Sequence, residues 1–255
     1  MLYLVESFLS IQGEGKYAGT PSVFFRFGGC NFTCKGFDTE FETKDGEKLA
    51  GCDSFFAVDV KNFKDSWDAY ENSQKLFEKL LFFTKDLNYL PDLVITGGEP
   101  LLHHTNEVFF GFVKKALKHG FRVCVETNAS IVMDFEKYEI YKNLIFAMSV
   151  KLSNSGEKKE KRVNLKAIET ICKNAKEAFF KFVVRKKMIE KGQAKEEISE
   201  ITSSFKNVQV YCMALGKDRF ELLENDKSVI DFCIQNGYIY TDRVHIRVWD
   251  NKKGV

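Results

Sequence analysis

The sequence alternates between short apolar runs and longer amphipathic runs, and this alternation constrains its fold more than any other feature. The short runs have the length and composition of strands, and a helical pattern lies in nearly every gap between them. Strands that are joined through helices run parallel in one sheet. The sequence therefore predicts the α/β class, as a partial βα barrel or an open doubly wound sheet. The predicted strands cover residues 22–27, 92–96, 121–126, 144–149, 178–184 and 208–213.

Elements outside this repeat are expected at both ends of the chain and after the first strand. Additional strands are predicted over residues 2–8 and 243–249, and a long irregular insertion over about 31–64. Loops of that length usually carry function or are disordered. No linker or internal repeat divides the chain, so a single domain over residues 1–255 is expected. Helices are predicted over about 66–85, 105–118, 134–142, 165–175, 195–205 and 218–236.

Composition excludes several classes of protein. The 255 residues are 44% hydrophobic and 29% charged, with a net charge of +2, which is unlike a disordered chain. A near-neutral chain also lacks the basic surface that nucleic-acid binding needs. No apolar run approaches the roughly 20 residues that span a bilayer, and no signal-peptide pattern opens the chain. We therefore expect a cytoplasmic protein without nucleic-acid or membrane partners.

The cysteines suggest a metal centre rather than disulfides. Their number, seven, is odd, and no secretion signal is present. Cys30 and Cys34 follow the first predicted strand directly, and Cys52 is the next cysteine along the chain. Thiolates at such spacing can hold zinc or an iron–sulfur cluster, although two unrelated free thiols would fit the spacing alone. The others fall in apolar patterns and are expected to be small buried side chains: Cys124, Cys172, Cys212 and Cys233.

Polar motifs follow the predicted strands at their carboxyl ends, where α/β proteins place their ligands. Each motif ends a different strand, so several tips are expected to meet at one polar mouth. Arg26 lies inside an apolar strand and must reach a partner, either a structural carboxylate or an anionic substrate. The strand-end motifs are Gly28-Gly29-Cys30, Thr96-Gly97-Gly98-Glu99-Pro100, Glu126-Thr127-Asn128, Ser149-Val150-Lys151 and the segment beginning at Met213.

Taken together, these motifs and the turn Gln12-Gly13-Glu14-Gly15 resemble those of the 7-carboxy-7-deazaguanine synthases, in the same order from residue 6 to the end of the chain. These are radical S-adenosylmethionine enzymes of queuosine (7-deazapurine) biosynthesis. The resemblance implies a partial (β/α)6 barrel of the radical S-adenosylmethionine type.

The resemblance also implies a reaction. Three cysteines would hold a [4Fe–4S] cluster whose fourth iron binds S-adenosylmethionine. One-electron cleavage would give a 5′-deoxyadenosyl radical that takes hydrogen from 6-carboxy-5,6,7,8-tetrahydropterin. Ring contraction with loss of ammonia would then give 7-carboxy-7-deazaguanine. Mg²⁺, a flavodoxin- or ferredoxin-type electron donor and a homodimer are implied as well.

Site residues are carried over from the family motifs position by position. Those implied to bind the pterin are Ile11, Gln12, Gly13, Glu14, Arg26, Thr96 and Val255. Those implied to bind the cofactor are Gly51, Cys52, Asp53, Gly97, Gly98, Glu99, Glu126, Thr127, Ser149, Val150, Lys151 and Met213.

The chain departs from the family pattern in its cysteine loop. An ungapped alignment puts Phe37 at the third ligand position, followed by Asp38 and Thr39, and phenylalanine cannot bind iron. We expect Cys52 to be the third ligand, because Asp53-Ser54 follows it as Asp-Thr follows the family's third cysteine. Ser54 would then bind Mg²⁺, which prefers oxygen ligands. Two milder departures are Val150 in place of proline, and Met213-Ala214 in place of Gln-Pro.

Two other functions are compatible with some of these features. A radical activase would keep the cluster but act on a partner protein, and the Gln12-to-Gly15 turn and Arg26 speak against it. A non-enzymatic zinc protein would use the three cysteines with His103 or His104 as the fourth ligand. Anaerobic purification would separate these possibilities, because an iron–sulfur protein is brown and a zinc protein is colourless.

Overall fold

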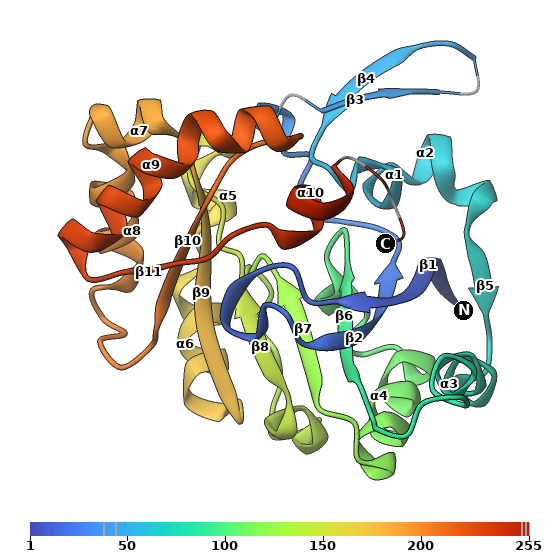
Figure 1. Ribbon diagram of the computed structural model, residues 1–255. Helices are drawn as coiled ribbons and strands as arrows, with labels where there is room; N and C mark the ends of the chain where they lie inside the picture. Colours follow the sequence, from blue (N-terminus) through green and yellow to red (C-terminus); the bar gives the residue numbers. More distant parts are fainter. Residues whose placement is uncertain (38, 44, 251, 253, 255) are drawn as a thin grey trace.

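The computed structural model describes residues 1–37, 39–43, 45–250, 252 and 254, and its main feature is one nine-stranded sheet (Figure 1). Six parallel strands form its centre, in the order β2, β6, β7, β8, β9, β10. They span Pro21–Phe27, Asp92–Gly97, Val123–Thr127, Ile145–Met148, Glu177–Val184 and Val210–Ala214. Their order confirms the α/β class and the six-stranded parallel arrangement.

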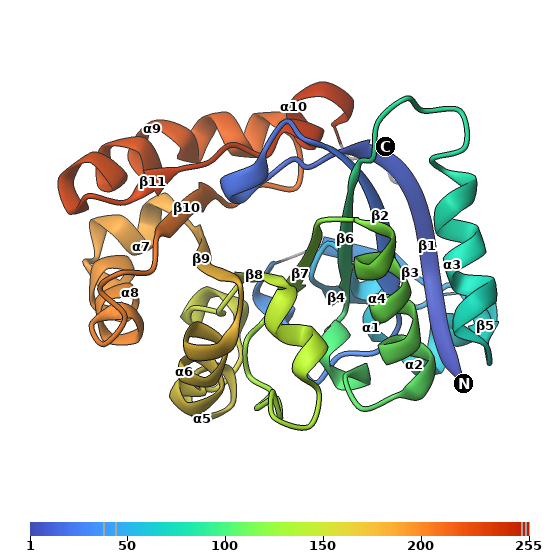
Figure 2. The ribbon, with the colours of Figure 1, turned by 90° about the horizontal axis from the view of Figure 1, so that it is seen from below.

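Shorter or antiparallel strands complete both edges. On one side β1 (Leu2–Ile11) runs antiparallel to β2, and β5 (Asp68–Tyr70) runs antiparallel to β1. On the other side β11 (Ile239–Tyr240) runs parallel to β10. Within the described residues β5 and β11 do not pair with each other, so the curved sheet stays open. Figure 2 shows this curvature, with the large helices on the outer side.

The helices between the strands begin and end where their capping residues predict. In α4 (Glu107–His119), the side chain of Asn106 accepts hydrogen bonds from the amides of Val108 and Phe109, and Gly120 ends the helix at a φ of 100°. Its apolar face packs on the sheet, where Phe112 stacks on Phe25 at 5.1 Å between ring centres. The other long helices are α3 (Ser73–Phe82), α6 (Leu165–Asn174), α8 (Gln193–Thr202) and α9 (Arg219–Asn236).

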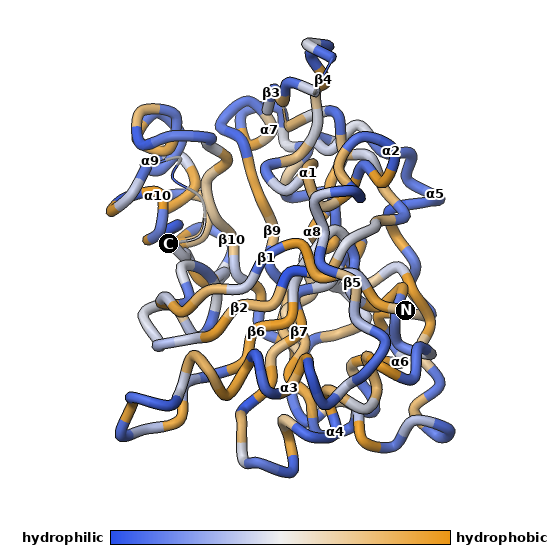
Figure 3. Tube along the Cα trace, turned by 90° about the vertical axis from the view of Figure 1, so that its right-hand side faces the viewer, coloured by the Kyte–Doolittle hydropathy of each residue, from blue (hydrophilic) through white to orange (hydrophobic). Residues whose placement is uncertain are grey.

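The core lies between the sheet and these outer helices. Every residue of β6 is buried, as expected for a central parallel strand that is covered on both faces. Figure 3 shows the central strands as the most hydrophobic part of the chain and the connecting loops as the most hydrophilic. This packing fixes the strands side by side, so their carboxyl ends come together at one edge of the sheet.

Three predicted elements are wrong. The segment over 243–249 is a helix, α10 (Val244–Trp249), because β11 already occupies the sheet edge and Arg243 and Arg247, one turn apart, both reach acidic partners. Residues 134–142 hold only a 3-10 turn (Glu139–Asn143), since the Asp134 carboxylate accepts from the next amides in an Asx turn. The helix expected from residue 66 starts at Ser73, after β5.

The insertion over 31–64 is not irregular. It contains an antiparallel hairpin of β3 (Thr39–Glu42) and β4 (Lys48–Gly51), followed by two short helices, α1 (Phe55–Val58) and α2 (Val60–Phe63). Phe41 of the hairpin packs against Phe55 at 5.6 Å between ring centres. In Figure 1 the hairpin extends from the top of the molecule, on the side of the carboxyl ends of the strands.

The remaining short elements are η1 (Gly15–Tyr17), η2 (Lys35–Phe37), η3 (Lys64–Ser66), η4 (Pro100–His103), η6 (Ser153–Ser155), α5 (Lys159–Arg162) and α7 (Lys186–Glu190). Within the described part of the chain, none of the helices has both the length and the apolar character that crossing a bilayer requires.

Candidate active site

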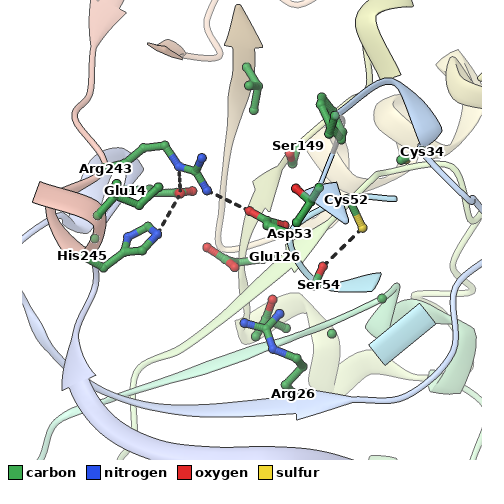
Figure 4. Close-up of a pocket in the computed structure, with 18 of the residues that line it drawn as sticks. Glu14, Arg26, Cys34, Cys52, Asp53, Ser54, Glu126, Ser149, Arg243 and His245 are labelled. Carbon is green, nitrogen blue, oxygen red and sulfur yellow. Dashed lines mark hydrogen bonds and ion pairs between the residues drawn. The ribbon is translucent and has the colours of Figure 1, made fainter. Parts of the chain in front are cut away.

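A cavity of about 490 Å³ lies at the carboxyl ends of the parallel strands. This size is within the range of small-molecule sites. Its wall includes most of the residues that the sequence singled out, contributed by segments far apart in the chain (Figure 4). The lining residues predicted from the sequence are Ile11, Gln12, Gly13, Glu14, Arg26, Cys30, Cys34, Cys52, Asp53, Ser54, Thr96, Gly97, Gly98, Glu126, Thr127, Ser149, Lys151 and Met213.

Three thiols form one wall of this cavity, which we call the thiol wall: Cys30, Cys34 and Cys52. The first two lie in the loop after β2, and the third follows β4 of the hairpin. Burial, with a smaller contribution from the nearby Cys52, raises the pKa of Cys30 to about 12 and that of Cys34 to about 11. The three thiols are thus close enough to influence one another, and without a metal ion they are neutral at physiological pH.

The backbone around the thiol wall leaves no room for larger residues. A Cβ atom on Gly98 would lie 2.3 Å from the carbonyl oxygen of Gly29 and 2.8 Å from the Cβ atom of Cys30. The tip of β6 therefore packs directly on the cysteine loop. This close approach explains why glycine stands at the end of the strand.

The histidines near the thiol wall do not complete a zinc site. Among the residues that the structure describes, no three His, Cys, Asp or Glu side chains are grouped closely enough to hold one metal ion. His103 Nε2 lies 2.9 Å from the Gly28 carbonyl oxygen, and His104 Nδ1 lies 2.7 Å from the Leu101 carbonyl oxygen. Both imidazoles are therefore engaged with backbone, which argues against the zinc alternative.

The opposite wall carries alternating charges, which we call the charged network. Lys181 Nζ lies 2.8 Å from Glu14 Oε2 and 2.9 Å from Glu126 Oε1. Arg243 Nε lies 2.8 Å from Glu14 Oε1, and its Nη2 lies 2.8 Å from Asp53 Oδ2. The network thus links β7, β9, the turn after β1, the residue after Cys52 and the residue before α10. Figure 4 shows the part of it that joins Arg243 to Glu14 and Asp53.

Electrostatics keeps this network ionised although it is largely buried. Burial alone would raise the pKa of Glu14, but Lys181 and Arg243 outweigh it and hold that pKa well below its usual range. Burial alone would lower the pKa of Lys181, but the charges of Glu126 and Glu14 outweigh this effect and raise it. The pKa of Glu126 is lowered in the same way, with Lys181 overcoming the effect of burial. Both carboxylates can therefore accept hydrogen bonds from a ligand.

Arg26 pairs with a structural carboxylate, that of Glu6, which is one of the two kinds of partner predicted from the sequence. Its Nε lies 2.7 Å from Glu6 Oε1 across the β1–β2 pair, and its guanidinium carbon lies 5.7 Å from the centre of the Phe56 ring. The side chain still lines the cavity. A structural ion pair and a ligand contact are therefore compatible at this position.

A few predicted residues do not line the cavity. The buried Glu99 carboxylate accepts hydrogen bonds from the Leu101 and Asn128 amides and from Thr127 Oγ1, so it joins the tips of β6 and β7, and a cofactor contact of Glu99 stays a prediction. The side chain of Val150 is buried, and Gly51 packs on Phe55. Val255 lies outside the described residues.

Sequence reasoning missed, among other lining residues, three titratable ones on the Glu14 side of the cavity. Lys181 gave the same signal as Arg26, a charged residue inside an apolar strand, and could have been found by it. Arg243 and His245 lie in the segment for which a strand is wrongly predicted, and His245 Nε2 is 3.8 Å from Glu14 Oε1. Nothing in the local pattern links that segment to Glu14.

Comparison with known proteins settles the family. The family described as "4Fe-4S single cluster domain" matches residues 11–172, which is more than half of the chain. The chain belongs to this family. The match spans the three cysteines of the thiol wall and the tips of β2, β6, β7 and β8, so the prediction of a [4Fe–4S] protein is confirmed.

Curated relatives over nearly the whole length carry one name. The 7-carboxy-7-deazaguanine synthase of Halobacterium salinarum is 26% identical, with 96% of this chain and 90% of the relative covered. That of Rickettsia prowazekii is also 26% identical, with 90% and 80% covered. These matches confirm the resemblance that the motifs predicted.

Solved structures agree at the level of the fold. The crystal structure of QueE from Escherichia coli has a TM-score of 0.61 and 24% identity, and the match covers 96% of this chain and 95% of that one. SuiB from Streptococcus suis bound to S-adenosylmethionine has a TM-score of 0.54 and 14% identity, with 84% of this chain and 48% of that one covered. The chain therefore shares the fold of both proteins.

Proposed function

We propose that this chain is a radical S-adenosylmethionine lyase that converts 6-carboxy-5,6,7,8-tetrahydropterin to 7-carboxy-7-deazaguanine. One observation carries the proposal: three thiols and a network of ionised carboxylates face each other across one small cavity at the carboxyl ends of the strands. The names of the full-length relatives support the same reaction.

In this proposal the thiol wall holds the [4Fe–4S] cluster through Cys30, Cys34 and Cys52. The chemistry that such a cluster supplies when bound is one-electron cleavage of S-adenosylmethionine. Three protein ligands suit this role because they leave one iron open to a substrate or cofactor. The high pKa values of the free thiols mean that a positive metal centre must stabilise the thiolates.

The cofactor would lie between the thiol wall and the tips of β6, β7 and β8. Gly97 and Gly98 offer backbone groups beside Cys30, and Ser149 and Lys151 line the same side of the cavity. Lys151 Nζ donates to Ser149 Oγ at 2.9 Å, which orients both groups toward the space. A lysine there can pair with the carboxylate of the methionyl group.

The pterin would lie toward the charged network. Glu14 and Glu126 are acceptors for the N–H groups of the pterin ring, while Gln12 can donate as well as accept. Gln12 Oε1 accepts from the Glu14 amide at 3.1 Å, and Gln12 Nε2 lies 3.4 Å from Glu126 Oε1. Arg26, at the edge of the cavity, would pair with the substrate carboxylate.

Ser54 is the proposed Mg²⁺ ligand, in keeping with Cys52 as the third cysteine. Cys52 Sγ and Ser54 Oγ are 3.6 Å apart and both line the cavity. Phe37 lines it as well but offers no ligand atom, and Asp38 lies outside the described residues. A flavodoxin- or ferredoxin-type electron donor, a homodimer and a cytoplasmic location complete the proposal, and all three rest on the family resemblance.

Product formation tests this function. The protein is reconstituted anaerobically with iron and sulfide, reduced, and incubated with S-adenosylmethionine and 6-carboxytetrahydropterin. We expect 7-carboxy-7-deazaguanine by mass spectrometry, together with one equivalent of ammonia per turnover. Wild-type protein that has a complete cluster and cleaves S-adenosylmethionine without forming this product would overturn the substrate assignment and favour the radical activase.

A further inference from the structure

The backbone of the cysteine loop is held by one carboxylate from a distant part of the chain. Glu157 Oε1 accepts hydrogen bonds from the Thr33 amide at 2.6 Å, from Thr33 Oγ1 at 3.1 Å and from the Cys34 amide at 3.1 Å. Glu157 Oε2 is paired with Lys161 Nζ at 3.0 Å. The side chain is 9% exposed, and it lies 123 residues beyond Cys34 in the chain.

These contacts fall where the loop has an unusual conformation. Cys34 has a φ of 43°, in the left-handed region that residues other than glycine rarely adopt. Two successive amides that converge on one oxygen form an anion-binding concavity, and a carboxylate placed in it stabilises that backbone shape. Glu157 therefore offsets the cost of the conformation at the residue that carries the second thiol.

The segment around Glu157 is itself fixed against the cysteine loop. A Cβ atom on Gly36 would lie 2.1 Å from the Asn154 carbonyl oxygen, so η2 and η6 are in direct contact. Arg185 Nη2 donates to the Gly36 carbonyl at 2.8 Å, and the Ser153 amide donates to Glu197 at 2.8 Å. The carboxylate is thus held by a rigid support and not by a freely moving side chain.

We propose that Glu157 is a positioning residue for the cluster: it holds Cys34 in the left-handed conformation from which this thiol binds iron. The inference rests on the proposed role of Cys34 as a cluster ligand. Glu157 does not line the cavity and has no part in binding substrate. Its effect should therefore appear in the cluster itself before any turnover takes place.

The test compares three variants after anaerobic reconstitution, by iron and sulfide content per chain and by the EPR spectrum of the reduced cluster. Glu157→Ala removes the acceptor, and we expect at least a twofold loss of bound iron and altered g values in what remains. Glu157→Gln keeps an acceptor oxygen, and we expect iron content near that of wild type. Glu157→Gln also removes the negative charge beside the Cys34 thiolate. We therefore expect the reduction potential of the cluster in this variant to be more positive than in wild type. Glu160→Ala, at an exposed acidic residue three positions along, should match wild type in every measurement.

The outcomes separate this proposal from the proposed function. Wild-type iron content and an unchanged EPR spectrum in Glu157→Ala would overturn it, as would equal iron loss in Glu157→Ala and Glu157→Gln. Circular dichroism of the cluster-free variants checks folding. If Glu157→Ala does not fold, Glu157→Asp decides the matter. This variant keeps the negative charge but withdraws the acceptor oxygen by one methylene group, so its EPR g values must differ from those of wild type, and unchanged g values would overturn the proposal. A wild-type protein that binds no iron at all would instead reject the cluster, and with it the proposed function.

Discussion

The two walls of the cavity differ in how completely the protein alone satisfies them. In the charged network each cation has carboxylate partners within 2.9 Å, and burial is balanced by opposite charge. In the thiol wall burial raises the pKa of each cysteine, and carboxylates nearby add to the effect on Cys30 and Cys52. The charged network is therefore stabilised by contacts within the folded protein, whereas the thiol wall needs a metal centre to stabilise its thiolates.

The largest expected effect tests the thiol wall. Cys52→Ala should lose the cluster, with iron falling from about four per chain to background, because two thiolates cannot hold a cubane in place of three. Cys124→Ala is the control: this buried thiol lies in β7, away from the cavity, and the variant should keep its iron. Full iron content in Cys52→Ala would show that the third ligand has been misassigned.

The next effect tests the charged network. Lys181→Met leaves Glu14 and Glu126 buried without their shared cation, and breaking such a pair costs about 3–5 kcal/mol. We expect the free energy of unfolding in urea to fall by about that amount in the cluster-free protein. Lys16→Met removes a half-exposed pair with Glu177 near the start of the same strand, β9, and should cost about 0–1 kcal/mol. An equal loss of unfolding free energy in Lys181→Met and Lys16→Met would contradict a charged network that stabilises the protein before the cluster is bound.

A smaller effect is expected where the two walls meet. Arg243 bridges Glu14, Asp53 and the Gly216 carbonyl, whereas a lysine has no planar fork and cannot reach all three. Arg243→Lys should therefore raise the KM for the pterin about tenfold, equivalent to about 1.4 kcal/mol, with little change in iron content. A drop in iron with an unchanged KM would place Arg243 with the thiol wall instead.

Much of the fold and of the thiol wall could be predicted from the sequence, but from different kinds of evidence. The strand positions followed from apolar periodicity, and burial of Cys124, Cys212 and Cys233 followed from the same pattern. The thiol wall needed the family resemblance, because the separation of Cys34 and Cys52 alone predicts nothing. The hairpin between them was missed, since its strands are short and alternate polar with apolar residues only weakly.

The charged network was harder to predict because its members are distant in sequence. Glu14 and Arg243 are 229 positions apart, and Glu126 and Lys181 are 55 apart. Ion pairs of this kind depend on how the strands are ordered, and periodicity does not report that order. The alternation of Val244, Ile246 and Val248 also favours a strand, and only the structure shows that β11 occupies the sheet edge.

The smallest effect concerns pH. Because the pKa values of Glu14 and Glu126 are lowered in the folded protein, the stability they contribute is present above their usual pKa of about 4.5 and is lost as the pH falls through their folded values. Urea unfolding between pH 7 and pH 3 should show this loss in wild type and a shallower dependence in Lys181→Met. Parallel curves for the two proteins would mean that other carboxylates dominate the acid response.

The bond between Arg243 and Glu14 also has a consequence for biosynthesis. After Glu14 the ribosome must add 229 further residues to reach Arg243, one of the two cations that neutralise this carboxylate. During that interval the strands can already pair one after another, but the reaction chamber stays open on one side. A nascent chain can therefore form much of its apolar core before this side of the cavity is complete.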